Sequence, residues 1–226
     1  MHLQRSKFLC ALNGEIFMQR FFDLLFSSVA IIFLLPLLIP VMVILRLTGE
    51  GEVFFRQARV GKGKVSFSLL KFATMLKNSE QIGAGTVTLK DDFRVLPVGV
   101  FLRKTKLNEL PQLFNILLGD MSIIGPRPLH DKQFSFYSED DQIIISSTMP
   151  GLSGVGSIVF RDEEKILQSS SDPDKTYRDR ITPEKAKYEK WYVEHKSLLL
   201  YFKLILFTVI AIIFPSVDMK KYFKNL

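Results

Sequence analysis

The most apolar segment of the chain lies near its N-terminus. From Leu24 to Leu45 there are 22 successive residues without a charge, bounded by Asp23 and Arg46. A helix of that length is roughly 33 Å long, which is enough to reach across the hydrocarbon core of a bilayer. The segment is longer than the apolar region of a signal peptide, and no small-residue cleavage site follows it. The pattern therefore predicts a membrane segment that is retained.

Two prolines interrupt this segment. Pro36 and Pro40 each remove a helix hydrogen bond and clash with the preceding turn, so the sequence predicts a kink near the middle. A kinked helix can return to the membrane face that it entered, whereas a proline-containing helix can also span, and the segment alone leaves both alternatives open. Residues 1–20 hold three Lys or Arg and one Glu, and residues 46–77 hold seven Lys or Arg and two Glu. Basic flanks on both sides suit a segment that returns to one face.

Shorter apolar patterns predict the elements that follow. Residues 51–106 mix short apolar runs with Gly and basic residues, which is typical of strands and loops. An amphipathic helix is predicted next, and its apolar face is formed by Leu110, Leu113, Phe114 and Leu117. Pro111 can begin this helix, and Gly119 ends it. Residues 125–128 read GPRP, so Pro126 and Pro128 hold Arg127 in a stiff, non-helical turn.

The last third of the chain predicts a linker and two helices. Residues 169–174 are rich in Ser and Asp and suggest an exposed linker. The Thr-Pro pair at 182–183 predicts a helix that runs toward His195. Residues 198–217 are apolar but contain Lys203, and the uncharged part is too short to span a bilayer. This pattern favours an interfacial or half-buried helix.

These elements predict an α+β fold that is mostly α-helical. We expect an N-terminal extension at 1–19, a membrane helix at 20–48, a catalytic domain at 49–196, and an interfacial helix with a basic tail at 197–226. Met18 opens the stretch MQRFFDLL and is an alternative start.

The charge and the cysteine content narrow the function class. The net charge of +7 suits a nucleic acid, an anionic membrane surface or a phosphorylated substrate. The basic residues share the chain with a long apolar segment, and neither a reading helix nor a stacking-aromatic motif is recognised, so we expect no nucleic-acid partner. The single cysteine, Cys10, excludes an internal disulfide and is compatible with a reducing cytoplasm.

The densest group of candidate functional residues lies in residues 101–128. Its charged members are Arg103, Lys104, Lys106, Glu109, Asp120 and Arg127. Guanidinium groups present forked donors that match phosphate oxygens, so Arg103 and Arg127 are candidate ligands of a diphosphate. A carboxylate beside them could bind a divalent cation that bridges the same phosphates. A solvated basic face in which Asn108 or Asp120 caps a turn is the alternative that composition leaves open.

The same residues resemble the signature of the bacterial sugar transferases, also called monotopic phosphoglycosyl transferases. The usual form of that signature is an Arg, five residues later an Asp-Glu pair, and then LPQ, GDMS and GPRP. The matching residues here are Arg103, Asn108-Glu109, 110–112, 119–122 and 125–128. The resemblance covers nearly all of residues 20–214, including RFFDLLFS with its kink proline Pro36 and the PGLSG element at 150–154. Arg161 lies where the family often has a basic residue.

This resemblance implies a fold, a reaction and a location. It implies a reentrant helix hairpin that holds the domain on the cytoplasmic face of the bacterial inner membrane, with amphipathic helices in the interface of the lipid bilayer. It also implies an Mg²⁺-dependent ping-pong reaction. In the family, the Asp of the pair attacks the β-phosphate of a UDP-sugar, releases UMP and forms an acyl-phosphate, and polyprenyl phosphate then takes the phosphosugar. Whether the protein forms a homodimer stays open.

Carried onto this chain, the resemblance assigns a role to each candidate residue. The catalytic pair becomes Asn108 and Glu109, and Glu109 is also the expected metal ligand. The residues expected to bind phosphate or substrate are Arg103, Lys106, Arg127 and Arg161. Pro36, Pro126 and Pro128 are expected to be structural.

Two departures from the family pattern affect this assignment. Ala73 stands where the family usually has Arg or Lys, which removes one possible phosphate donor. Asn108 stands where the nucleophile is expected, and an amide oxygen is a far poorer nucleophile than a carboxylate. Three explanations remain: Glu109 replaces the nucleophile, polyprenyl phosphate attacks directly, or the chain is a catalytically silent scaffold that binds nucleotide sugar or lipid phosphate. We favour activity, because Arg103, Glu109, Asp120 and Arg127 all remain together.

Overall fold

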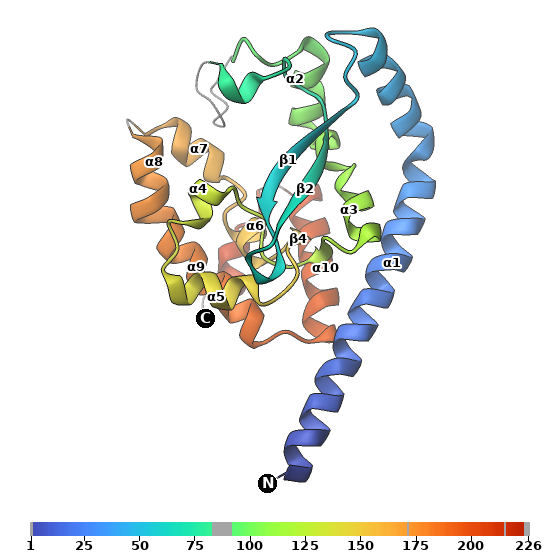
Figure 1. The fold of residues 1–226 in the computed structure, drawn as a ribbon. Helices are drawn as coiled ribbons and strands as arrows, with labels where there is room; N and C mark the ends of the chain where they lie inside the picture. Colours follow the sequence, from blue (N-terminus) through green and yellow to red (C-terminus); the bar gives the residue numbers. More distant parts are fainter. Residues whose placement is uncertain (1, 83–91, 171, 215, 224–226) are drawn as a thin grey trace.

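The computed structural model describes residues 2–82, 92–170, 172–214 and 216–223. It is mostly helical and contains two small two-stranded sheets, which confirms the predicted α+β, mostly α class at this level. One long helix runs along one side of the molecule, and the remaining elements pack beside it (Figure 1).

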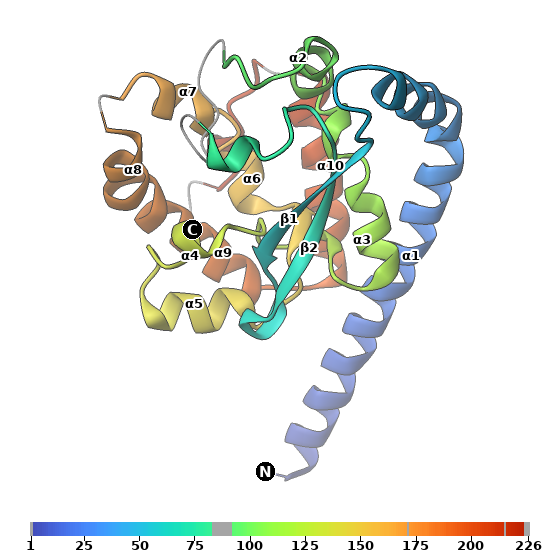
Figure 2. The same cartoon turned by 45° about the horizontal axis from the view of Figure 1, so that its top comes forward.

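The long helix is α1, His2–Leu47. The expected boundary between residues 19 and 20 falls inside it. Its N-terminal end projects beyond the rest of the molecule, and it bends near its C-terminal end (Figures 1 and 2). Pro36 and Pro40 both lie inside α1, and the predicted kink appears as a bend rather than a break. Within the described residues, the part Gly14–Leu47 is long and apolar enough to cross a membrane.

Polar contacts fix α1 at the start of its apolar segment. The Arg20 guanidinium donates to the carbonyl oxygens of Ile116 (2.6 Å) and Leu117 (3.1 Å). The Asp23 carboxylate accepts from the backbone amide of Ile123 and from the hydroxyl of Tyr201, both at 2.9 Å. Because all these contacts are buried or partly buried, they attach this end of α1 firmly to the domain.

Apolar packing fixes the other end of the segment. The cluster there is formed by Leu38, Val41, Leu45, Phe72 and Leu102. The opposite side of α1 is exposed, and its large apolar residues include Phe21, Leu25, Val29, Ile32, Phe33 and Val43. A continuous exposed apolar stripe of this length indicates contact with lipid or with another protein.

The predicted strands form a hairpin. Strands β1, Phe54–Val60, and β2, Ser66–Phe72, pair antiparallel, with Phe54 opposite Phe72 and Val60 opposite Ser66. The turn between them is η1, Lys62–Lys64, in which Gly63 and Lys64 have positive φ. Burial alternates along β1, as expected for a strand with one face on the core.

The signature region forms short helices. They are η2 (Ser79–Gln81), α2 (Pro97–Lys104), η3 (Leu107–Glu109) and α3 (Gln112–Leu118). Pro111 precedes α3, and Gly119 ends it in the left-handed conformation with φ 97°. The predicted start and stop of this helix are therefore confirmed.

The rest of the domain is helical around one small parallel sheet. Strands β3 (Ser122–Ile124) and β4 (Gly151–Ser153) pair through Ser122 with Gly151 and Ile124 with Ser153. The helices are α4 (Asp131–Phe134), α5 (Glu139–Ser146), α6 (Val155–Val159), α7 (Glu163–Gln168), α8 (Pro173–Thr176), the π-turn η4 (Tyr177–Ile181), α9 (Thr182–Glu194), α10 (Leu198–Ile213) and η5 (Met219–Phe223).

Two of the C-terminal predictions are confirmed, and one needs a correction. Helix α9 starts at the Thr-Pro pair, and α10 is half-buried, with Tyr201, Leu204 and Phe207 inside. The linker predicted at 169–174 was too long, because α8 begins at Pro173. The Asp172 side chain accepts a hydrogen bond from the Lys175 amide (3.0 Å) and so starts this helix.

Candidate functional site

The candidate site is built on the short turn between α2 and α3. Lys106 has a left-handed backbone with φ 60° and starts η3, which carries Asn108 and Glu109. Buried Leu102 of α2 packs against Leu107 and so holds this turn on the core. The two residues of the expected catalytic pair therefore lie on a packed turn and not on a free loop.

Glu109 lies at the centre of a group of positive charges. Its Oε1 is 3.3 Å from Nη2 of Arg127. Burial alone would raise the pKa of Glu109, but the charges of Arg127, Lys71 and Lys106 outweigh it and lower the pKa to about 2. Glu109 also raises the pKa of Arg127. The site thus holds an ionised carboxylate and several cations at neutral pH.

Lys71 enters the same site from β2. Burial lowers its pKa to about 8, while Glu109 pulls the pKa upward and Arg127, Arg59 and Arg103 push it down. These several cations around one carboxylate give the site a net positive charge. A positively charged site suits a multiply charged anion such as a diphosphate.

Asn115 of α3 fixes the strand that carries Lys71. Its Oδ1 accepts from the Leu70 amide (2.9 Å), and its Nδ2 donates to the carbonyl oxygen of Ser68 (2.8 Å). The same Nδ2 donates to Oδ2 of Asp120 (3.1 Å). Asp120 is therefore occupied in the joint between α3 and β2, and the structure places it away from the Glu109–Arg127 pair in this role.

The GPRP loop presents Arg127 through close backbone packing. The amide of Gly125 donates to the carbonyl oxygen of Ser153 (2.9 Å), and the amide of Gly151 donates to that of Pro126 (2.8 Å). A Cβ added at Gly125 would lie 2.3 Å from the Met149 carbonyl oxygen, so only glycine fits there. The GPRP loop and the PGLSG element thus hold each other in place through backbone hydrogen bonds, which explains why both motifs are present.

Asn108 is buried with 8% of its surface exposed, and its Oδ1 has no hydrogen-bond partner among the described residues. Amide and carboxylate oxygens, such as those of Asn108 and its neighbour in sequence Glu109, are the kinds of atom that Mg²⁺ prefers. No group of three or more His, Cys, Asp or Glu side chains that could hold a metal occurs in the described part of the chain. A cation bound by Asn108 and Glu109 would take one or two oxygens from these side chains and the rest from phosphate and water.

The comparisons with known proteins agree with this geometry. The sequence model of the family described as "Bacterial sugar transferase" matches residues 14–215. The chain belongs to the bacterial sugar transferase family.

Individual relatives share most of this chain. It is 36% identical over 202 residues to a UDP-N-acetylgalactosamine-undecaprenyl-phosphate N-acetylgalactosaminephosphotransferase of Aeromonas hydrophila. The aligned region covers 87% of this chain and 44% of that protein. It is 32% identical over 208 residues to the exopolysaccharide production protein ExoY of Sinorhizobium fredii, with 86% and 84% covered. It is 32% identical over 205 residues to a UDP-glucose:undecaprenyl-phosphate glucose-1-phosphate transferase of Klebsiella pneumoniae, with 88% and 41% covered. The chain thus spans less than half the length of the first and third of these relatives.

In this member of the family, the predicted site residues fall into two groups. Glu109, Arg127 and Lys106 come together, and Arg103 is close enough to affect the pKa of Lys71. Arg161 has a different position: its guanidinium donates to the carbonyl oxygens of Ala211 (3.2 Å) and Val217 (3.1 Å). It therefore holds the end of α10 and the tail that follows. Pro126 and Pro128 are buried on both sides of Arg127, as a structural role requires.

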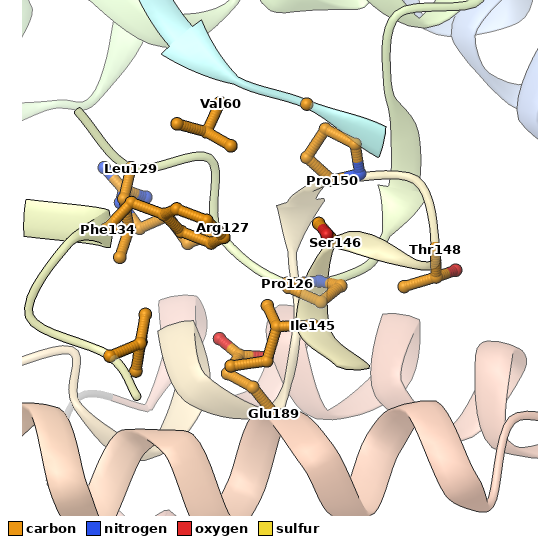
Figure 3. Close-up of a pocket in the computed structure, with 12 residues that line it drawn as sticks. Val60, Pro126, Arg127, Leu129, Phe134, Ile145, Ser146, Thr148, Pro150 and Glu189 are labelled. Carbon is orange, nitrogen blue, oxygen red and sulfur yellow. The ribbon is translucent and has the colours of Figure 1, made fainter. Parts of the chain in front are cut away.

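Sequence reasoning missed two residues around this site. They are Lys71 of β2 and Glu189 of α9, neither of which the sequence pattern singles out as a site residue. Glu189 is only 2% exposed and lies beneath the GPRP loop in Figure 3. The signal for Lys71 was a single Lys within an otherwise uncharged strand, whereas no pattern in the sequence of α9 distinguishes Glu189 from its other acidic residues.

Proposed function

We propose that this chain is a phosphoglycosyl transferase that moves a sugar 1-phosphate from a UDP-sugar to polyprenyl phosphate. The products are polyprenyl-diphosphate-sugar and UMP, and the reaction is a membrane step of glycan assembly. The relatives' names describe transfers of this kind to undecaprenyl phosphate, and the family membership extends that chemistry to this chain. The single observation that carries the proposal is the ionised Glu109 held among Arg127, Lys71 and Lys106.

The cations suit the charge that the reaction handles. Both substrates are phosphate anions, and UMP leaves with additional negative charge on its phosphate. Arg127 and Lys71 can stabilise that charge because they are already in place, so little reorganisation is needed. Arg103 and the exposed Lys106 add positive charge to the same site, which suits the phosphate of the second substrate.

We propose that Glu109 takes the place of the missing Asp nucleophile. Its carboxylate oxygen would form a bond to the β-phosphorus while the bond from that phosphorus to the bridging oxygen breaks, and UMP leaves with the electron pair. A phosphate oxygen of polyprenyl phosphate then attacks the acyl-phosphate, and Glu109 is released as a carboxylate. A side chain whose pKa is about 2 is ionised and also a good leaving group.

Mg²⁺ is the proposed cofactor, and the residues that would hold it are Glu109 and Asn108. When bound, it would neutralise the charge of the phosphate oxygens that it contacts. The unpartnered Oδ1 of Asn108 supports a role for this side chain as a neutral oxygen ligand. An Asn108→Ala variant should weaken Mn²⁺ binding, which is measurable by electron paramagnetic resonance without any turnover.

Exchange of UMP tests the nucleophile. Detergent-solubilised protein is incubated with a UDP-sugar and radiolabelled UMP in the absence of polyprenyl phosphate. A covalent intermediate on Glu109 predicts label in the UDP-sugar, and it predicts that Glu109→Gln abolishes the exchange whereas exposed Glu194→Gln does not. Product formation with acceptor but no exchange without it would indicate direct attack. Neither exchange nor product with a panel of UDP-sugars would overturn the proposed function.

We also propose that α1 enters the membrane and returns to the cytoplasmic face. Arg20 and Asp23 at one end of its apolar segment and Leu45 at the other end all contact the same domain, which supports this arrangement. Cysteines placed at Gly14 and Gly51 in a Cys10→Ser background should both react with a membrane-impermeant reagent only from the cytoplasmic side. Labelling of the two positions from opposite sides of the membrane would show that α1 spans the bilayer and would exclude this arrangement.

A further inference from the structure

A large cavity to which the proposed reaction assigns no role lies between α6, the start of α7 and the C-terminal segment, residues 216–223. Its volume is about 400 Å³, which falls in the range of small-molecule binding sites. Ile158 and Val159 of α6 and Met219 of the C-terminal segment form part of its apolar lining. The cavity therefore has the size and the apolar surface of a ligand site.

Arg161 fixes one wall of this cavity. Its guanidinium donates to the carbonyl oxygen of Ala211 in α10 and to that of Val217 beside the cavity, at 3.2 and 3.1 Å. One side chain thus ties the end of α10 to the C-terminal segment. Because Arg161 itself lines the cavity, the same contacts that hold the segment also define the shape of the cavity.

The C-terminal segment is held by further contacts. Nζ of Lys220 lies 4.9 Å from the centre of the Phe160 ring and 3.7 Å from the carboxylate of Glu184, on the exposed side of α9. Met219 and Phe223 are only 3% and 4% exposed, so they anchor the segment in the core. The cavity is therefore formed before a ligand arrives, and binding needs little ordering of the chain.

The charge of this cavity differs from that of the site around Glu109. Of the described residues that line it, three are acidic and two are basic: Asp162, Glu163, Asp218, Arg161 and Lys220. Both basic side chains take part in the contacts that build the wall. This balance does not favour a diphosphate, whereas carboxylates accept hydrogen bonds from the hydroxyl groups of a neutral ligand.

A sugar fits both properties of the lining. A pyranose ring carries hydroxyl groups around its edge and presents apolar C–H groups on its faces. The carboxylate of Asp162, whose side chain is 53% exposed, and the hydroxyl of Ser216 can bind the hydroxyl groups. The apolar side chains of α6 and Met219 can contact a face of the ring.

The cavity also lies close to the residues that would bind the diphosphate. Helix α6 lines it, and Gly156 of the same short helix lies against Glu189, because a Cβ at Gly156 would be 2.1 Å from Oε1 of Glu189. Glu189 and Arg127 line one pocket together (Figure 3). The charge of Glu109 raises the pKa of Arg127, and so does that of Glu163, which lines the large cavity.

We propose that this cavity binds the sugar of the donor while the diphosphate lies at Glu109 and Arg127. The inference rests on the proposed function for the identity of the ligand, a UDP-sugar. Occupation of the cavity by a sugar can be measured without turnover.

Methyl NMR of the full chain in detergent tests this occupation. Protein with ¹³C-labelled Met methyl groups is titrated with UDP and with a panel of UDP-sugars that includes UDP-N-acetylgalactosamine and UDP-glucose, with Mg²⁺ present. The Met219→Leu variant assigns the Met219 signal. At least one UDP-sugar should shift this signal, whereas UDP should not, because only the sugar enters the cavity. The signal of exposed Met18 in α1 is the control and should not shift with either ligand.

Binding by two variants tests the lining. Asp162→Ala removes a hydrogen-bond acceptor, and Ser216→Phe places a ring at an exposed position of the cavity wall. Measured by isothermal titration calorimetry, each should weaken binding of the UDP-sugar about 10-fold and leave the Kd for UDP unchanged. Asp140→Ala is the matched control, since Asp140 is an exposed acid of α5 outside this cavity, and it should change neither Kd. Unchanged binding of UDP also shows that each variant is folded.

The outcomes separate the sugar site from the proposed function. If a UDP-sugar shifts the Met219 signal but no UMP or product forms, the proposed function fails and the sugar site stands. If product forms but UDP and UDP-sugar act alike on Met219, or if both variants bind the UDP-sugar as Asp140→Ala does, the sugar site is wrong and the function stands. If no UDP-sugar of the panel binds, both are wrong.

Discussion

At the scale of single residues, the site is defined by one carboxylate with a lowered pKa and one carboxyl group with a raised pKa. Glu109 is half-buried and Glu189 is buried, and burial alone would raise both pKa values. Glu109 differs because Arg127, Lys71 and Lys106 surround it, whereas Glu189 has a Lys that is already paired with Glu163. The number of uncompensated cations near each group decides which effect wins.

Lys71 should give the reaction a pH limit on the alkaline side. Its pKa is lowered to about 8, so it loses its positive charge as the pH rises through that value, and the attraction for the diphosphate weakens. We expect the KM for the UDP-sugar to rise above about pH 8. Lys71→Arg keeps its charge and should move this limit upward, provided that the guanidinium is accommodated. A limit at the same pH in Lys71→Arg would mean that another group is responsible.

Glu189 should make stability depend on pH near neutrality. Its pKa in the folded protein is raised from 4.5 to about 7, so the unfolded chain releases this proton first. The contribution of the protonated form is complete below pH 4.5 and is lost as the pH rises through about 7. Urea unfolding of wild type and Glu189→Gln at several pH values measures this. In Glu189→Gln, the free energy of unfolding should no longer fall between about pH 4.5 and 7 for this reason, whereas in Glu184→Gln it should fall as in wild type. The same pH dependence in all three proteins would contradict the assignment of this decrease to Glu189.

At the scale of elements, the site depends on two joints between segments that are distant in sequence. Asn115 joins α3 to β2 and so places Lys71, and the backbone contact between residues 125–128 and 149–154 places Arg127. The first joint uses partly buried hydrogen bonds between the Asn115 side chain and the backbone of β2, and the second uses hydrogen bonds between backbone groups. Loss of either set leaves polar groups unsatisfied.

Gly125→Ala should disrupt the second joint. The new Cβ would meet the Met149 carbonyl oxygen at 2.3 Å, and backbone on both sides must move. We expect a loss of about 1–3 kcal/mol in the free energy of unfolding and a larger relative loss of UMP release. Gly14→Ala is the control, because nothing lies within 4 Å of that position in α1, and it should stabilise the protein by about 0.5–1 kcal/mol. Wild-type activity in Gly125→Ala would show that the joint does not position Arg127.

At the scale of the whole molecule, one helix and one domain form a single unit. Helix α1 contacts α3, β3, α10 and the apolar cluster of β2 and α2, while its other side stays exposed. The domain is thereby fixed to the helix that the membrane would hold, so the site keeps a constant position relative to a lipid-bound substrate.

Arg20 should contribute measurably to this attachment. Its guanidinium binds the last carbonyl groups of α3, where a positive charge also interacts favourably with the helix dipole. Arg20→Ala should lower the free energy of unfolding in detergent by about 1–2 kcal/mol. The exposed Arg56 of β1 is the matched control and should change it by less than about 0.5 kcal/mol. Equal effects would mean that apolar packing alone holds α1.

The sequence by itself determined the features that depend on local chemistry. The apolar segment, the helix from Pro111 to Gly119, the GPRP turn and the start of α9 all follow from periodicity and from turn residues that act on their neighbours. The sequence also placed Glu109 and Arg127 in one site, because the family signature contains both. Tertiary structure decided the rest: it brought Lys71 of β2 to Glu109, moved Arg161 to the end of α10, and placed Glu189 behind Arg127. These three residues are far from the signature in sequence, and only packing between elements, which no local pattern encodes, fixes the distances among them.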